Sequence, residues 1–361
     1  MKNTWKGILG CFLMAALLCG CGKSEDEKEV ALITDGGTVG TASFHKEAWD
    51  GIARYCKEEE LTYGNYIPDE QSTEGFEKAI SEAAENGARV IVCAGDEFSE
   101  AVGSMQSEYK KIKFLLLDAV PVDEDGKEYI RRNTHAVLFS EQQAGFLAGY
   151  AAVTEGYTNL GFMGGEESEQ NIQYGAGFIQ GADYASKEKG LGAGQVTIRY
   201  KYEGSDELKP SVMADANAWY RGGCQVIFAC GQPMQTAVQK SAETLGKAVI
   251  GSNYNQSSLS DSVVISAVKR VQEIAYQQVG AALDGDFKGG EKESLGTGHD
   301  GVGLTMAYTT MTQFTQESYS AIYGQMAEGK IKVTGKEISS DPSAAGVENV
   351  TVQVEEAQTE E

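Results

Sequence analysis

Short apolar runs of strand length alternate with segments of helical period along residues 30–268. Several runs are apolar at successive positions, which is typical of strands that helices cover on both faces. The alternation predicts an α/β fold with parallel strands joined by right-handed helical crossovers. Strands are predicted at 30–34, 89–94, 113–117, 136–139, 159–163, 196–200, 225–229, 248–251 and 263–268.

One helix shows the pattern clearly. Between Ser72 and Gly87, apolar residues recur at the spacing of one buried helical stripe: Phe76, Ile80, Ala83 and Ala84. Asn86-Gly87 then supplies a left-handed stop before the next strand. Similar stops are predicted at Gly190, Gly222-Gly223 and Gly246.

A chain of 361 residues is long enough for two packed domains. Two α/β blocks precede residue 252, joined by the polar stretch 122–133, and further units follow at 263–283 and 301–329. If each block takes one of these units, the chain crosses between two lobes more than once, and the cleft between them can close by hinging. We assign 30–133 plus 255–292 to lobe 1 and 134–254 plus 293–336 to lobe 2. The residues 337–361 are expected to be an acidic, partly disordered tail.

The first 21 residues differ from the rest. Lys2 and Lys6 precede the apolar run 8–18, and small residues follow. This pattern predicts an export signal, because the run is shorter than the roughly 20 residues that a spanning helix needs. The polar residues 22–29 are expected to be a flexible tether. The alternative is an uncleaved apolar start with an incidental cysteine.

The end of this leader, Leu18-Cys19-Gly20-Cys21, resembles the bacterial lipobox. The resemblance implies cleavage before Cys21, a diacylglycerol on its sulfur and a further acyl chain such as palmitate on its amine. Two or more chains hold a protein stably on a membrane. We therefore expect attachment to the outer face of the cell membrane.

The formal charge of −23 makes nucleic acid a poor partner, since its phosphates would be repelled. Four cysteines lie beyond Cys21 and lack the paired short spacing of a zinc site. They are Cys56, Cys93, Cys224 and Cys230, and we interpret them as core residues. No metal or other cofactor is expected.

Ligands of open α/β sheets bind beyond the carboxyl ends of the strands. Polar and aromatic residues occupy these positions in the predicted strands: Asp35, Ser43, Phe44, His45, Asp118, Gly231, Gln232, Asn253 and Lys269. This set suits a neutral solute with many hydroxyl or amide groups and one flat ring. The alternative for single residues is structural: Asp35 caps a helix and Phe44 belongs to the core.

The segments Thr34-Asp35-Gly36-Gly37 and Ser43-Phe44 resemble the opening signature of the basic membrane protein family, the purine nucleoside receptor group of substrate-binding lipoproteins. The resemblance continues through 145–150, 161–165, 177–181, 226–228 and 268–271, and so covers most of 30–311. It implies two lobes of the type I periplasmic-binding fold joined by three crossovers, and nucleosides as the solutes.

The resemblance also implies roles for single residues. Phe44 stacks on the base, Asp35 and Asp118 bind polar groups of base or sugar, and Gly231 and Lys269 help to hold the ribose. Three positions depart from the family pattern. His45 replaces an asparagine, Asn253 replaces the aspartate that grips the ribose hydroxyls, and Asp206 lies where a second stacking ring is expected, with Tyr202 the nearest ring.

The sequence therefore predicts a monomeric receptor that delivers a nucleoside-like solute to the permease and ATPase subunits of an ABC importer. A ligand-sensing lipoprotein without its own importer would have the same fold and remains an alternative. A nucleoside-processing enzyme is a weaker one, because it needs a nucleophile with a base or an acidic metal cluster. The chain has only His45, His135 and His299 and lacks the common hydrolase motifs, so we expect His45 to bind solute rather than to catalyse.

Overall fold

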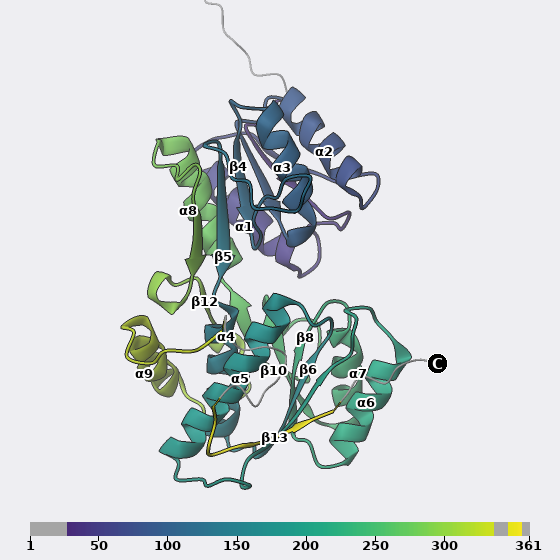
Figure 1. The fold of residues 1–361 in the computed structure, drawn as a ribbon, viewed down its shortest axis with the longest axis vertical. Coiled ribbons are helices and arrows are strands. Elements are labelled where there is room, and N and C mark those ends of the chain that lie inside the picture. Colours follow the sequence, from purple (N-terminus) through teal and green to yellow (C-terminus); the bar gives the residue numbers. More distant parts are fainter. Residues whose placement is uncertain (1–26, 336–345, 356–361) are drawn as a thin grey trace, which may run out of the picture.

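The structure is a computed structural model that describes residues 27–335 and 346–355. It has two lobes, each a mostly parallel sheet covered by helices (Figure 1). The predicted leader, Cys21 and residues 22–26 of the predicted tether lie outside the described residues. Within the described ranges, no helix combines the length and the hydrophobicity that crossing a bilayer requires.

Lobe 1 is built on a six-stranded parallel sheet in the order β11-β5-β4-β3-β1-β2. Alternate residues of β1, which lies next to the edge strand β2, face opposite layers: Val30 and Leu32 pack with α1 and α8, whereas Ala31 and Ile33 pack with α2 and α3. The strands are β1 (Val30–Ile33), β2 (Tyr63–Tyr66), β3 (Val90–Ala94), β4 (Lys113–Leu117), β5 (Thr134–Phe139) and β11 (Lys292–Leu295). The helices are α1 (Phe44–Glu58), α2 (Thr73–Glu85), the short η1 (Asp96–Phe98), α3 (Ser99–Glu108) and α8 (Val271–Asp284).

Lobe 2 is built on a seven-stranded sheet in the order β12-β10-β9-β8-β6-β7-β13, in which β12 alone runs antiparallel to its neighbour. Its strands are β6 (Asn159–Gly164), β7 (Thr197–Tyr202), β8 (Val226–Cys230), β9 (Ala248–Asn253), β10 (Val263–Lys269), β12 (Val302–Leu304) and β13 (Thr351–Val354). Its helices are α4 (Glu141–Glu155), α5 (Glu169–Glu188), α6 (Pro210–Arg221), α7 (Gln235–Leu245), α9 (Gln316–Ala327) and the short η2 (Thr297–His299) and η3 (Met306–Tyr308).

Local sequence signals explain many of the element ends. Ser72 caps α2 by accepting a hydrogen bond from the Gly75 backbone N–H at 3.1 Å, and the predicted apolar stripe of this helix faces the core. Gly87 follows with a φ of 90°, as the predicted left-handed stop requires. The nine strands predicted from sequence are all present, with ends that shift by one or two residues. The four predicted core cysteines are buried and free.

The helices α4 and α5 of lobe 2 lie unusually close together because glycines face each other across their contact. A Cβ on Gly149 would lie 2.0 Å from the Phe178 carbonyl oxygen, and one on Gly177 would lie 2.0 Å from that of Gln142. Neither position can accept a side chain without separating the helices. This close contact fixes α5, whose first turn reaches the space between the lobes.

The chain crosses between the lobes three times: from β5 to α4, from β10 to α8, and from β11 through η2 to β12. The number agrees with the prediction, but all three predicted boundaries are shifted. β5 belongs to lobe 1, because it pairs with β4, and β10 belongs to lobe 2, because it pairs with β9. Residues 293–295 were assigned to lobe 2, but they belong to β11, which pairs with β5 in lobe 1. The polar stretch 122–133 resembled a linker, yet it folds back within lobe 1 through a bridge between Val122 and Glu128.

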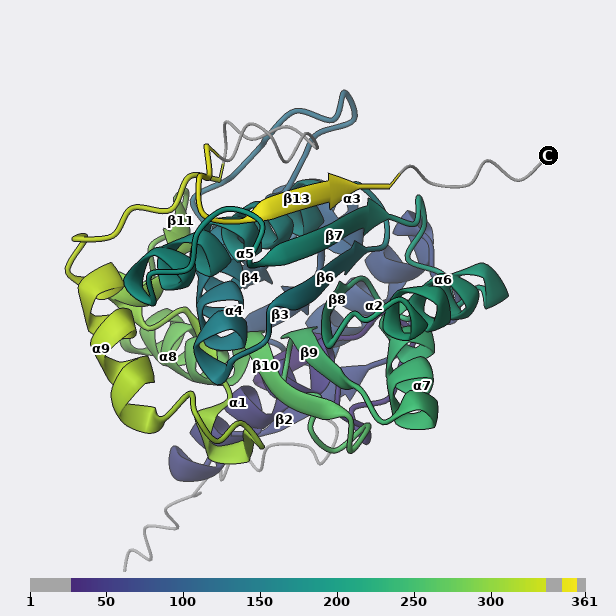
Figure 2. The same ribbon diagram turned by 90° about the horizontal axis from the view of Figure 1, so that it is seen from below.

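The predicted tail also needs a correction. Residues 351–354 form β13, which adds a parallel strand to the edge of the lobe 2 sheet beside β7 (Figure 2). Glu355, which follows it, accepts a hydrogen bond from the indole Nε1 of the buried Trp219 at 2.9 Å. Part of the segment expected to be an acidic, partly disordered tail is therefore a component of lobe 2.

Candidate functional site

A cavity of about 810 Å³ lies between the lobes, where strands of both sheets end. Ligands of open α/β sheets bind beyond the carboxyl ends of the strands, so this cavity lies where a ligand is expected. Nine of the sequence-predicted residues line it, although they come from segments far apart in the chain: Asp35, Ser43, Phe44, His45, Asp118, Asp206, Gly231, Gln232 and Asn253. Two others, Tyr202 and Lys269, are not on its wall.

The first turn of α1 forms part of the lobe 1 wall. Ser43 caps this helix by accepting a hydrogen bond from the Lys46 backbone N–H at 3.1 Å. The two residues that follow, Phe44 and His45, therefore occupy fixed positions at the cavity. The Phe44 ring is partly exposed there, so it offers a flat apolar surface to a solute.

Lys269 lies behind the wall and is 1% exposed. Its ammonium donates to Asp118 Oδ2 at 2.6 Å and to Gln170 Oε1 at 3.0 Å, and it lies 3.0 Å from Glu141 Oε1. An ammonium has three protons, and these three acceptors can take all of them. Lys269 thus holds Asp118 in place, whereas the sequence predicted that it contacts the solute directly.

The charges of this buried group depend on one another. Burial raises the pKa of the Asp118 carboxyl, and Lys269 opposes this shift. Burial by itself would lower the pKa of Lys269, but the carboxylates of Asp118 and Glu141 outweigh burial and raise it. The lysine therefore stays charged, and its single positive charge is shared by the carboxylates of Asp118 and Glu141.

Asp118 and Asn253 both have the left-handed backbone conformation, with φ of 69° and 68°. Residues other than glycine adopt it rarely, and such residues concentrate at functional sites. Asp118 follows β4 and Asn253 ends β9, so the two face the cavity from different lobes. The Asn253 Oδ1 accepts a hydrogen bond from the Tyr174 hydroxyl at 3.2 Å. The side chain of Asn253 can therefore offer its amide N–H groups to a solute.

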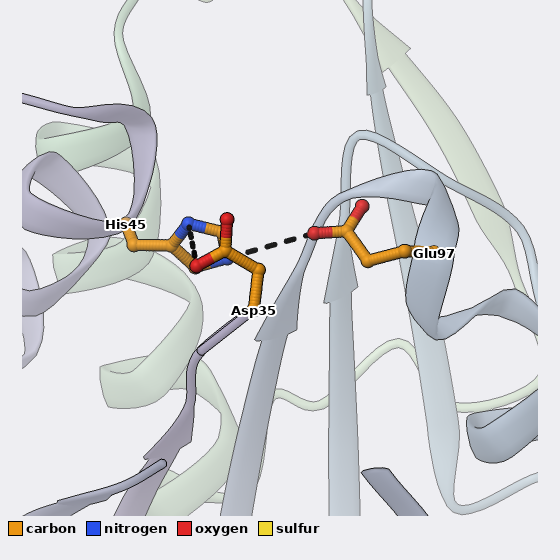
Figure 3. A group of neighbouring side chains, drawn as sticks. All are labelled: Asp35, His45 and Glu97. Carbon is orange, nitrogen blue, oxygen red and sulfur yellow. Dashed lines mark ion pairs between the residues drawn. The ribbon is translucent and has the colours of Figure 1, made fainter. Parts of the chain in front are cut away.

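Asp35, His45 and Glu97 form a compact group on the lobe 1 wall (Figure 3). The His45 Nδ1 lies 3.6 Å from Asp35 Oδ1, and its Nε2 lies 3.8 Å from Glu97 Oε1. Burial lowers the pKa of His45 despite the nearby Asp35 carboxylate. Burial also raises the pKa of Glu97 to about 8, aided by Asp96 and Asp35. We call Asp35, His45, Asp96 and Glu97 the acid end of the cavity.

Three polar atoms at the cavity are buried and have no hydrogen-bond partner within the described chain: His45 Nε2, Gln142 Oε1 and Gln232 Nε2. All three residues line the cavity. Buried polar atoms without a partner are uncommon in folded proteins, because leaving one unpaired costs about 1–3 kcal/mol. Their position on the wall is what a site for a polar solute requires.

The family pattern places a second stacking ring near Tyr202 and Asp206, and the structure shows where these two residues lie. Tyr202 packs against the core, and its hydroxyl lies 2.7 Å from that of Tyr200, so its ring does not face the cavity. Asp206 does line the cavity, and its Oδ1 accepts a hydrogen bond from the Glu166 backbone N–H at 2.9 Å. A carboxylate thus occupies the wall where the sequence comparison expected an aromatic ring.

Sequence reasoning missed several residues of the wall, among them Asp96, Glu97, Glu141 and Gln170. Three of these four residues follow the carboxyl end of a strand, as the predicted wall residues do. Asp96 and Glu97 follow the end of β3, and Glu141 follows the end of β5. Gln170 lies in the first turn of α5, after the loop that follows β6, and its amide reaches Lys269.

Comparisons with known proteins agree with this architecture. A family model described as ABC transporter substrate-binding protein PnrA-like matches residues 28–343. The ABC transporter nucleoside-binding protein BmpA of Lactococcus lactis subsp. cremoris is 25% identical over 351 residues, which cover 89% of this chain and 95% of that protein. Basic membrane protein A1 of Borrelia garinii subsp. bavariensis is 29% identical over 257 residues, covering 70% of this chain and 72% of the relative.

Solved structures show the same fold. A crystal structure of ABC transporter solute-binding proteins from Aeropyrum pernix K1 superposes with a TM-score of 0.68 at 19% identity, covering 88% of this chain and 96% of that one. A solute-binding protein from Conexibacter woesei gives 0.68 at 18% identity, with coverage of 85% and 99%. The relatives are binding proteins of transport systems rather than enzymes. The chain therefore belongs to the PnrA-like family of ABC transporter substrate-binding proteins.

Proposed function

We propose that the protein is a lipid-anchored receptor on the outer face of the cell membrane. It binds a nucleoside or a related ring-bearing polar solute between its lobes and delivers it to the permease and ATPase subunits of an ABC importer. The family membership supports the transport role, and the name of the Lactococcus relative supports nucleosides as the solute class. The lipobox-like sequence at Cys21 supports the anchor.

One observation carries the solute class: a partly exposed Phe44 ring on the wall of an interlobe cavity, surrounded by polar groups. A flat heterocycle can stack on the ring, and stacking of this kind contributes about 1–3 kcal/mol. Asp35 and Asp118 can accept hydrogen bonds, and Asn253 can donate them. A cavity of about 810 Å³ has ample space for a molecule with one base and one sugar.

Binding can drive closure of the lobes. A solute that contacts both walls stabilises the closed form more than the open one, so its binding shifts the population toward closure. Asp118 from lobe 1 and Asn253 from lobe 2 are the residues in a position to make such bridging contacts. A membrane permease can then distinguish loaded from empty receptor by shape, without any covalent step.

The test is calorimetric titration of the purified protein with a panel of purine and pyrimidine nucleosides, with free sugars and amino acids as controls. We expect at least one nucleoside to bind saturably. The free sugars and the amino acids should not bind. Binding should also raise the melting temperature, because a ligand at 100 times its Kd adds about 2.7 kcal/mol of stability. Absence of binding by every nucleoside at millimolar concentration would contradict the proposed solute class.

A further inference from the structure

The distribution of charge in the cleft narrows the solute class, and this inference rests on the proposed function. Nine carboxylate side chains line the cavity. Its described lining includes one lysine, Lys292, and no arginine. Lys292 pairs with Glu128, and Lys269 behind the wall pairs with Asp118 and Glu141. Six carboxylates therefore remain without a lysine or arginine partner within 4.0 Å in the described chain: Asp35, Asp96, Glu97, Glu166, Glu169 and Asp206.

These six carboxylates come from both walls of the cleft. Asp35, Asp96 and Glu97 belong to the acid end on lobe 1, and the other three lie on lobe 2. Asp96 is close enough to the Asp206 carboxyl to contribute to its raised pKa, whose main cause is burial. The two walls thus carry charge of the same sign at one end of the cavity, and closure of the lobes brings these charges nearer to each other.

Backbone and amide N–H groups reach some of these six carboxylates, but no lysine or arginine of the described chain pairs with them. His45 is the basic side chain that lies between Asp35 and Glu97, and burial lowers its pKa, so it is neutral at pH 7. The groups around Glu97 are Asp35, Asp96 and the neutral His45, none of which is a cation. Glu97 responds by holding a proton at pH values where an ordinary glutamate has lost it. The His45 Nε2, in a residue 9% exposed, has no hydrogen-bond partner and points toward this carboxyl.

We propose that the solute is a cation, with its positive charge on the ring or on an attached amine, and that this charge lies at the acid end among Asp35, Asp96 and Glu97. The ring then lies against Phe44, whose ring centroid is 6.5 Å from that of His45 at the acid end. At the Lys269 end, the carboxylates of Asp118 and Glu141 already share an ammonium, so this end takes the uncharged part of the solute. Anionic solutes such as nucleoside phosphates are excluded, because they would face carboxylates on both walls.

The charge of the solute also acts on closure. Without a cation, the facing carboxylates oppose the approach of the two walls. A bound cation is attracted to the carboxylates of both walls, and this attraction outweighs their mutual repulsion. A cation therefore favours the closed form more than an uncharged solute of the same shape does. Its arrival also stabilises the ionised form of Glu97, and binding of a cation is therefore accompanied by release of a proton.

Isomeric nucleosides provide the test. At pH 7, 1-methyladenosine carries a positive charge on its ring, whereas its isomer N6-methyladenosine is neutral. The same relation holds between 3-methylcytidine and 5-methylcytidine. We expect the cationic member of at least one pair to bind at least about tenfold more tightly, which is the effect of one favourable charge contact. Calorimetry in buffers of different ionisation enthalpy should show proton release with the cationic member alone. Adenosine 5′-monophosphate should bind more weakly than adenosine.

The isosteric variant Glu97→Gln separates charge from shape. It should reduce the preference for the cationic isomer at least threefold and abolish the proton release, while Glu243→Gln on the outer helix α7 should change neither. If the neutral isomers bind as tightly as the cationic ones in both pairs, or Glu97→Gln leaves the preference intact, the inference is overturned and the nucleoside receptor stands. If no nucleoside of either charge binds, the proposed function itself fails.

Discussion

The ammonium of Lys269 lies 3.0 Å from the Glu141 carboxylate, and this contact joins two of the three segments by which the chain crosses between the lobes. Lys269 ends β10 at one crossover, and Glu141 begins α4 at another. The same ammonium binds Asp118 of lobe 1 at 2.6 Å. One buried cation therefore links the base of the cleft to its wall.

Removing that cation should destabilise the protein. Lys269→Met leaves Asp118 and Glu141 buried without a partner, and breaking a buried ion pair in this way typically costs about 3–5 kcal/mol. Urea unfolding monitored by circular dichroism measures the loss. The triple variant with Asp118→Asn and Glu141→Gln has no unpaired charge and should recover most of it. Equal stability of the single and triple variants would show that the ion group has no such role.

Phe44→Ala should weaken solute binding without unfolding the protein. The ring is only partly buried against the core, so its removal should lower the stability without unfolding the protein. Loss of one stacking surface should raise the Kd about 5- to 150-fold, corresponding to about 1–3 kcal/mol. Calorimetry and thermal melting check both parts of this expectation. Tyr308→Ala is the control, because its aromatic ring is 59% exposed and lies outside the cavity lining. Unchanged affinity in the Phe44 variant would remove the stacking role.

Glu97 should make the stability of the empty protein depend on pH. Its folded pKa of about 8 lies above the ordinary value of 4.5, so the folded state holds the proton more tightly than the unfolded state does. The stabilisation is complete below pH 4.5 and is lost as the pH rises toward 8. Glu97→Gln lacks this dependence, so its melting temperature relative to the natural protein should rise between pH 5 and 8. Solvent screens this side chain, which is 33% exposed, so the rise should be modest.

The matched variant Glu243→Gln should show a constant difference from the natural protein over the same pH range. A constant difference for Glu97→Gln as well would mean that this carboxyl titrates as an ordinary glutamate. In that case the empty cleft would carry its full negative charge at pH 7.

The close contact between α4 and α5 predicts a strong size limit at Gly149. An alanine Cβ there would lie 2.0 Å from the Phe178 carbonyl oxygen, so the helices must separate, at a cost of about 1–3 kcal/mol. Gly324→Ala in α9 is the control, since no atom lies within 4 Å of the added Cβ. That substitution should be neutral or slightly stabilising. The melting temperature should therefore fall for Gly149→Ala and stay equal or rise for Gly324→Ala, and similar shifts in the two variants would contradict this account of the contact.

The proposed anchor has a control within its own motif. Cys21→Ala removes the sulfur to which the lipid would attach, so the protein should leave the membrane fraction of the expressing cells. Cys19→Ala changes a neighbouring cysteine and should leave the protein in that fraction. If both variants stay in the membrane fraction, or if both leave it, Cys21 is not the specific site of attachment.

The apolar strands and the amphipathic helices could be predicted from sequence because their patterns are local. The strands missed were β2, with the sequence YGNY, β11, with KESL, the three-residue β12, and β13 at the far end of the chain. β2, β11 and β13 lie at or near sheet edges and carry polar residues, so no apolar run marks them. The lobe boundaries were wrong because strand pairing, rather than composition, decides which sheet β5 and β10 join.

Nine residues of the cavity wall could be predicted, all but Asp206 because the carboxyl ends of parallel strands meet at one edge of a sheet. The rule placed Asp118 and Lys269 in the same region, although 151 residues separate them. It could not show that Lys269 is buried, since that depends on Glu141 and Gln170 reaching the same ammonium from α4 and α5. Glu97 was within reach of the rule, but the end of β3 was not considered.

A crystal structure of the protein with its tightest-binding nucleoside would test the central claim most directly. We predict electron density for the solute between the lobes, with its ring against Phe44 and its polar groups within hydrogen-bond distance of Asp118 and Asn253. Density for the solute at any place outside this cavity, or within it but touching neither lobe 1 nor Phe44, would contradict the account.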